Sequence, residues 1–422
     1  MKKIIAVFLI FSILFAFTGC SFKKSDNTNN NTIEIISPKT STENPPDTIT
    51  KASGLNITKP FEFSNGFAWI NHQKPEGGTT YSLINTKGDI LYSNENIISA
   101  HDMSGDTCFI EEKDGENTVY KIIDNAGKEV ASSQSGNFDI ILSQGDNAFF
   151  VYKHISDIDT SKHLFGTIDN KGNFINELKE TPLYNTSNTF KSNYLGADFF
   201  VVWLSMSDGL LYNANTQNFF YIDNIEYVDE PINIGSNLYF RFDYYSPGIT
   251  YENTPDKWSK LSNYFSLSSN GTVKEIEKFG NVINEKLLTK LDNKLTVFDP
   301  ISNESKTFSK YHVLSAKSAD KDSFLLQVWG KDKKSYFLLI DASCNITLDP
   351  VQADFAEAND GKIILEKDNT FFILDYYGNK LFETSEYSQI KPFNSGIACA
   401  YKSIDGTTYY YGLDASGNVV IS

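Results

Sequence analysis

The sequence contains little cysteine and histidine and almost no arginine. Four cysteines, five histidines and one arginine, Arg241, occur among 422 residues. Besides Cys20 there are three cysteines without short spacing, and this pattern favours neither a disulfide framework nor a zinc site. We interpret Cys108, Cys344 and Cys399 as small buried hydrophobic residues, with a Cys344–Cys399 disulfide as the alternative. A single arginine also excludes bidentate recognition of phosphate or carboxylate as a repeated theme.

Catalytic and metal-binding motifs are also missing. There is no Gly-x-Ser-x-Gly sequence of the kind that carries a nucleophilic serine. His154 and His163 flank Asp157 and Asp159, but four potential ligands within ten residues arise easily by chance in an acidic segment. We therefore predict no catalytic residue, no metal and no cofactor. Carboxylate pairs for sugar hydrolysis stay open, because 53 acidic residues offer many pairs.

The amino terminus predicts the compartment. The positive stretch MKK precedes an apolar run from Ile4 to Phe17, which is short for a membrane-spanning helix. The run ends in "FTGC", which resembles the lipobox of bacterial lipoproteins, with Phe17 where that family usually has leucine. The resemblance implies a signal peptide over residues 1–19 and lipidation of Cys20, whose two acyl chains would anchor the protein stably. Plain secretory cleavage is the alternative.

Residues 20–56 are predicted to be the lipidated cysteine and a disordered linker. The segment from Ser21 to Ser53 is rich in Asn, Thr, Ser and Pro. It has too few apolar residues for their burial to offset the conformational entropy lost on ordering. A flexible chain of this length spans roughly 30 Å. We expect a membrane-attached protein that faces the extracytoplasmic side of a Gram-positive cell, because a tether of this kind suits a cell wall.

The net charge excludes one class of partner. Removal of residues 1–19 takes away Lys2 and Lys3, so the formal charge falls from −16 to −18. A chain this acidic repels phosphate backbones, and we therefore expect no nucleic acid partner.

After residue 56 the sequence is rich in aromatic and β-branched residues and repeats itself about every 41 residues. The first unit reads "SNGFAWI", "TYSLIN", "DILYS" and "NIISA", and the last repeats it as "NSGIACAY", "YYYGLD" and "NVVIS". Turns are expected at nine places: Gly88, Gly127, Gly172, near Gln217, Gly271, Ser302, Asn345, Gly378 and Gly417. The segment from Ile283 to Leu291 also has helical spacing, so a helix there is the alternative.

The recurring Asp-x-x-Gly segments predict tight hairpins. An Asp or Asn side chain can accept hydrogen bonds from the turn backbone, and glycine adopts the positive φ that other residues resist. A calcium loop at Asp169 fails, because the alternating acidic ligands and the terminal glutamate are missing.

The strands predict the fold. "FAWI" and "SFLLQVW" have no polar face, so both faces of each sheet must be covered. Stacked four-stranded blades achieve this, and we predict an all-β protein whose residues 57–422 form a β-propeller. Nine repeat units are counted, and eight blades are the alternative. Trp69, Trp203 and Trp329 lie in such strands and are expected in the core.

Three segments resemble a known repeat. "FSNGFAWI" with "YSLINTKGDIL", "FGTIDNKGNFI" and "SGIACAY" with "YYGLDASGNVVI" are similar to WG repeats of bacterial proteins. Phe165 or Tyr411 replaces the tryptophan of that repeat, and "TYSLI" lacks its glycine. The resemblance implies a repeat scaffold and no particular activity.

Three long loops are predicted between second and third strands, at residues 71–80, 153–163 and 243–263, and should share one face. The third contains the candidate ligand-binding residues, whose rings suit sugars or a partner protein: Tyr244, Tyr245, Tyr251 and Trp258. Packing of this loop onto its own blade is the alternative.

Two functions are compatible with these features. The favoured one is a surface-anchored binding module for a cell-wall glycan, a peptide or a partner protein. The alternative is an extracytoplasmic glycan-active hydrolase or lyase that uses acidic residues near the propeller axis. We favour binding because no repeat unit carries a recognisable catalytic set.

Overall fold

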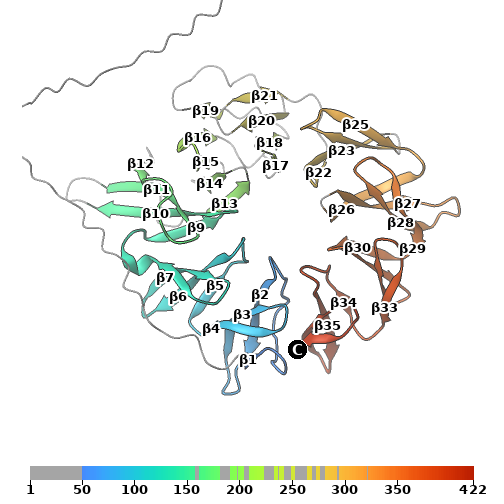
Figure 1. Cartoon of the computed structure of the whole chain (residues 1–422), viewed down its shortest axis with the longest axis horizontal. Helices are drawn as coiled ribbons and strands as arrows, with labels where there is room; N and C mark the ends of the chain where they lie inside the picture. Colours follow the sequence, from blue (N-terminus) through green and yellow to red (C-terminus); the bar gives the residue numbers. More distant parts are fainter. Residues whose placement is uncertain are drawn as a thin grey trace, which may run out of the picture. The chain divides into compact units, whose positions relative to one another are not determined.

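A computed structural model of the chain describes residues 50–156, 161–180, 191–196, 198–203, 209–222, 232–235, 237–241, 249–251, 264–268, 272–275, 281–291, 294–320 and 322–422. They all belong to one compact unit, residues 44–422. These residues form nine small antiparallel sheets (Figure 1). The one helix in this described part is the 3-10 turn η1 (Ser133–Ser135), so none of the described helices can cross a bilayer.

Six of the nine sheets, called blades, have four strands in chain order. They are blade two, β5 (Ile97–Ala100), β6 (Thr107–Asp114), β7 (Asn117–Asp124), β8 (Glu129–Ser132); blade three, β9 (Ile140–Gln144), β10 (Ala148–Ser156), β11 (Ser161–Asp169), β12 (Lys179–Glu180); blade six, β22 (Asn281–Ile283), β23 (Lys286–Leu291), β24 (Lys294–Asp299), β25 (Glu304–Phe308); blade seven, β26 (His312–Asp320), β27 (Ser323–Trp329), β28 (Ser335–Asp341), β29 (Ile346–Gln352); blade eight, β30 (Phe355–Asn359), β31 (Lys362–Lys367), β32 (Thr370–Asp375), β33 (Lys380–Thr384); and blade nine, β34 (Gln389–Ile390), β35 (Ala398–Ile404), β36 (Thr407–Leu413), β37 (Val419–Ile421).

The other three blades depart from this simple chain order. They are blade one, β2 (Phe67–Gln73), β3 (Thr79–Asn85), β4 (Asp89–Asn94) and β1 (Thr50–Lys51) on its edge; blade four, β13 (Lys191–Gly196), β14 (Phe199–Trp203), β15 (Gly209–Asn213), β16 (Asn218–Ile222) and β19 (Ile249–Tyr251); and blade five, β17 (Ile232–Ile234), β18 (Asn237–Arg241), β20 (Tyr264–Ser268), β21 (Val273–Glu275). An additional strand, β1, lies on the edge of blade one, and β19, which falls between two strands of blade five in the sequence, joins the sheet of blade four. In blade one, Ile57 takes the first-strand position through a bridge to His72.

The nine sheets confirm the prediction of an all-β β-propeller with nine units rather than eight. The helical alternative for Ile283–Leu291 is wrong, because β22 and β23 form a hairpin there. The predicted grouping of strands needs a correction. "NIISA", which contains β5, pairs with β6 and begins blade two instead of ending blade one. In a cyclic repeat, sequence similarity alone does not show where a blade starts.

The core lies between blades, as expected for strands that are apolar on both faces. Each apolar cluster joins residues of neighbouring blades, and blades four and five meet through β13 and β17. The last interface joins blade nine to blade one and closes the propeller. Representative buried pairs are Leu83 and Ile110, Phe109 and Phe149, Phe150 and Phe200, Tyr239 and Leu287, Leu288 and Leu326, Leu325 and Leu365, Ile373 and Ala400, and Ile421 and Ile70.

The Asp-x-x-Gly segments form the predicted tight hairpins, and these turns join third and fourth strands. In the turn after β32, the Asp375 carboxylate accepts hydrogen bonds from the amides of Tyr377 (2.9 Å) and Asn379 (2.8 Å). Gly378 there has φ 86°. Where glycine is replaced, other residues take a positive φ: Gln217 (54°), Asn303 (61°) and Cys344 (65°). The last two correct the turn positions expected at Ser302 and Asn345 by one residue.

Turns between first and second strands link neighbouring blades on the same side as the Asp-x-x-Gly turns. We call this side the turn face. The Asp320 carboxylate of blade seven accepts from the amides of Asp360 (2.9 Å) and Gly361 (3.1 Å) in blade eight. The Asp360 carboxylate in turn accepts from the Gly396 amide of blade nine (2.6 Å). Short acceptor side chains in these turns therefore tie the blades together.

Candidate functional site

The face opposite the turn face carries the connections between second and third strands and the links between blades. We call it the long-loop face. Antiparallel strand order puts the first two predicted long loops on it, as expected. The first is shorter than predicted, because β2 continues to Gln73 and β3 begins at Thr79. Most of the third, residues 243–248 and 252–263, lies outside the described residues. The segment from 153 to 163 is largely an extension of the β10–β11 hairpin.

Four of the five predicted site residues, Cys20, Tyr244, Tyr245 and Trp258, lie outside the described residues. Tyr251 is placed by its backbone: it ends β19, where it pairs with Phe220 of β16. A segment of the blade-five loop thus extends the sheet of blade four. The aromatic patch on this loop stays a prediction.

The hairpin of blade three brings the two predicted histidines together. His154 and His163 are paired across the ladder, with ring centroids 5.4 Å apart. Tyr152 Oη lies 2.8 Å from His163 Nδ1. Burial, and then the neighbouring His154, lower the pKa of His163. Asp157 and Asp159 lie outside the described residues, and within those residues no three His, Cys, Asp or Glu side chains gather as metal ligands.

One exposed tryptophan was assigned wrongly from the sequence. Trp329 ends β27 and is 44% exposed, so the prediction that it belongs to the core is wrong. It faces Ser335 across the hairpin and His312 on the other side. The preceding apolar run suggested burial, but Trp329 stands at the edge of the blade on the long-loop face. The adjoining "GKDKKS" was the sequence signal for a solvated hairpin end.

Lysines gather on the long-loop face of blades six and seven, although the whole chain has a formal charge of −16. They lie at the ends of β23 and β27, at the start of β24 and in the link before β26. All are exposed, and none forms an ion pair with a described residue. They are Lys290, Lys294, Lys310, Lys331, Lys333 and Lys334. Among described acids of these loops, Asp332 is their neighbour; its carboxylate accepts from Tyr336 Oη (3.1 Å).

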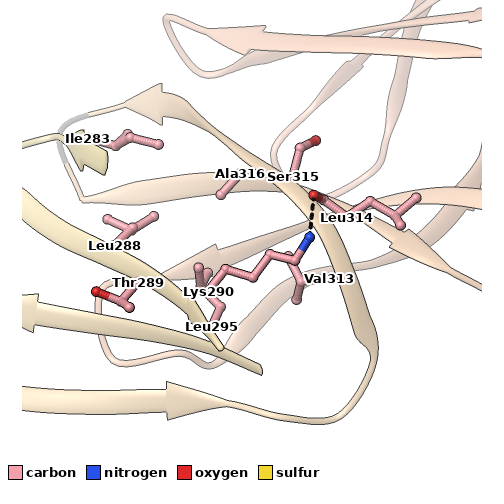
Figure 2. Close-up of a pocket in the computed structure, with 9 residues that line it drawn as sticks. All are labelled: Ile283, Leu288, Thr289, Lys290, Leu295, Val313, Leu314, Ser315 and Ala316. Carbon is pink, nitrogen blue, oxygen red and sulfur yellow. Dashed lines mark hydrogen bonds between the residues drawn. The ribbon is translucent and has the colours of Figure 1, made fainter. Parts of the chain in front are cut away.

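A cavity of about 330 Å³ opens beside these lysines, between blades six and seven. Figure 2 shows its lining: the apolar side chains come from both blades, and Lys290 reaches from blade six to the main chain of Leu314 in blade seven. The Lys290 ammonium donates a hydrogen bond of 3.1 Å to the Leu314 carbonyl. The lining residues are Ile283, Leu288, Thr289, Lys290, Leu295, Val313, Leu314, Ser315 and Ala316.

A local irregularity of blade seven borders the cavity. On the side of blade six, β22 pairs with Lys286–Leu288 of β23. In blade seven the register of β26 shifts between Val313 and Ser315, so Leu314 is an extra residue. Ser315 also lines a smaller hollow of about 80 Å³ towards blade eight. The register shift does not follow from the repeat pattern.

No protein family matches the sequence, and no curated protein is significantly similar to it. Solved β-propeller structures are similar to it over most of its length. BamB from Moraxella catarrhalis is 10% identical, with a TM-score of 0.30, over 88% of this chain and 96% of its own. Hsv2 from Kluyvelomyces marxianus is 8% identical, with a TM-score of 0.29, over 85% and 97%.

The strand pairing itself defines the class of protein, a β-propeller of nine blades. Its described long-loop face combines an exposed tryptophan, a lysine cluster and a cavity.

Proposed function

We propose that the protein is a surface-anchored, extracytoplasmic binding module that retains a cell-wall glycan, a peptide or a partner protein on its long-loop face. The exposure of Trp329 beside the lysines and the cavity carries this proposal. Exposed tryptophans in such settings anchor interfaces, because a large apolar ring is buried with little loss of conformational freedom. The sequence predicts Tyr244, Tyr245, Tyr251 and Trp258 on a loop of the same face.

The anchor and the repeat type are part of the proposal. The "FTGC" sequence supports lipidation of Cys20 at the outer side of the membrane, and the polar segment after it supports a tether. The Asp-x-x-Gly turns support the relation to WG repeats. A Cys20→Ala chain should be released into the medium or stay unprocessed. A cleaved Cys20→Ala chain that remains on the membrane would show that the lipobox interpretation is wrong.

Retention of ligand tests the binding role. The parent, Trp329→Ala and Tyr377→Ala are applied to a glycan array and to cell-wall and surface-protein fractions. Tyr377 is the matched control, since it is an aromatic residue with 87% exposure on the turn face. We expect the parent and Tyr377→Ala to be retained on the same fraction. Trp329→Ala should lose about 1 to 4 kcal/mol of binding.

Assay of the retained fraction for cleaved product separates the binding role from the hydrolase or lyase alternative. Retention without product supports the proposal. Equal retention of the parent and Trp329→Ala would remove Trp329 from the site, and turnover by the parent would favour the enzyme. Trp258→Ala, checked for an unchanged melting transition, tests the predicted loop in the same way.

A further inference from the structure

We propose that the cavity between blades six and seven binds an anionic amphiphile, a molecule with a carboxylate or phosphate head and an apolar tail. This inference rests on the proposed role of the long-loop face and names the ligand chemistry of one part of it. The cavity has apolar walls, one cationic group at its opening and a lysine cluster around it. Each of these features selects one part of such a molecule.

The walls select the tail. Leu288, Leu295 and Val313 are almost fully buried, at 4%, 3% and 1% exposure, and they face the cavity from both blades together with Ile283. A volume of about 330 Å³ lies at the lower end of the range for small-molecule sites. An alkyl chain placed there replaces water against apolar surface, which is favourable in proportion to the area covered. A sugar ring would instead leave its hydroxyls without partners on these walls.

Lys290 selects the head. Its ammonium can donate three hydrogen bonds, and the Leu314 carbonyl accepts one of them. Two donors are therefore left for oxygen atoms of an acidic group, and hydrogen bonds between charged groups are the stronger kind. Figure 2 shows Lys290 reaching from β23 to the Leu314 carbonyl of β26. The Ser315 hydroxyl is engaged elsewhere, because it donates to Gln327 Oε1 at 3.2 Å.

The surrounding charge favours an anion over a neutral head group. Lys294 and Lys310 lie on segments that adjoin lining residues Leu295 and Val313, and three more lysines occupy the hairpin end of blade seven. The acids of these two blades that are described lie mainly towards the turn face, where Asp299 and Asp320 occupy turns. The chain as a whole is acidic, so this local segregation gives the site a sign opposite to that of the rest of the surface.

Calorimetric titration of the full chain tests the inference with three probes below their micellar concentrations. Dodecyl phosphate has both head and tail, dodecyl maltoside has the tail with a neutral head, and inorganic phosphate is the head alone. We expect saturable binding of dodecyl phosphate that weakens as salt is added. Lys290→Gln should weaken it about tenfold, and Ala316→Leu, which fills the cavity, should abolish it. Lys128→Gln, an exposed lysine in a turn of blade two, should change nothing.

Each other outcome overturns the inference. Equal binding of dodecyl maltoside would show that charge is not recognised. Equal binding of inorganic phosphate would show a site for free phosphate without the cavity. Binding that survives in both Lys290→Gln and Ala316→Leu, with melting transitions like the parent's, would place the ligand elsewhere. If the chain is retained on a wall or protein fraction but does not bind dodecyl phosphate, the proposed function stands and this inference fails. If the chain binds dodecyl phosphate but is retained on no fraction, the proposed function fails and the cavity remains an amphiphile site.

Discussion

Gly127 in blade two lies directly against the main chain of Leu91 in blade one. A Cβ atom at Gly127 would stand 2.1 Å from the Leu91 carbonyl oxygen. Gly172, Gly378 and Gly417 lie against side chains of the fourth strand of the blade before them, where an added Cβ would stand 2.5 to 2.9 Å from the nearest atom. Glycine is therefore needed at this turn position for two reasons: the backbone has a positive φ, and the neighbouring blade leaves no room for a side chain.

This relationship predicts the effect of Gly127→Ala. The added methyl group meets backbone that cannot move independently, and φ at this position is 77°, so we expect a loss of about 3 kcal/mol in the free energy of unfolding. Gly115→Ala is the control, since φ there is 62° but no atom lies within 4 Å of the added Cβ. It should cost about 1 kcal/mol. Equal losses in urea unfolding would contradict the role of blade contact.

Closure of the propeller predicts a second pair of effects. The Leu55 amide donates to the Ser422 carbonyl at 2.7 Å, and Ile421 is fully buried in the cluster that joins blades nine and one. Ile421→Ala should lower the free energy of unfolding by about 3 kcal/mol, because it leaves a cavity in that interface. Val419→Ala, on the same strand at 48% exposure, should change it by less than about 0.5 kcal/mol. Similar effects of both substitutions would argue against a packed closure.

The turn carboxylates predict how stability depends on pH. The Asn379 side chain and then the turn amides hold the pKa of Asp375 below its ordinary value, and burial opposes this. A depressed folded pKa stabilises the folded state above the unfolded pKa, and this contribution disappears as pH falls through the folded pKa. The advantage of the parent over Asp375→Asn in melting temperature should therefore shrink from pH 6 towards pH 3. A difference that stays constant over this range would contradict the charge-dependent role.

The thiols predict a chemical accessibility pattern. No disulfide is present among the described cysteines, so the alternative of a Cys344–Cys399 bridge is wrong. Burial raises the pKa of Cys108 to about 12, and those of Cys344 and Cys399 to about 11. At pH 8 the three thiols of the folded chain should be alkylated slowly, and half-buried Cys344 should react first. In urea, which unfolds the chain, all three should be alkylated rapidly. Mass spectrometry of the cysteine peptides measures this, and rapid labelling of Cys108 in the folded chain would contradict its burial.

The sequence predicted the features whose cause is local. Asp375 and Gly378 define a turn by themselves, so the number and position of most hairpins followed from spacing. The start of each blade did not, because β5 fits the end of one unit as well as the beginning of the next.

The candidate site depends on tertiary irregularity and was not predictable. The cavity lies beside the register shift of β26 at Leu314, and this shift leaves no mark in the repeat. Trp329 looked like core because it ends an apolar run, whereas its exposure depends on where the neighbouring strands stop. The pairing of β19 with β16 likewise joins two blades through a long loop.

Hydrogen–deuterium exchange of the full chain, with and without the wall or protein fraction that it retains, tests the central claim most directly. The account predicts slower exchange on the long-loop face, in residues 309–317 and 329–336, and no change in the turns at residues 341–345 and 375–379. Protection confined to those turns, with residues 309–317 and 329–336 unaffected, would place the ligand on the opposite face and contradict the account.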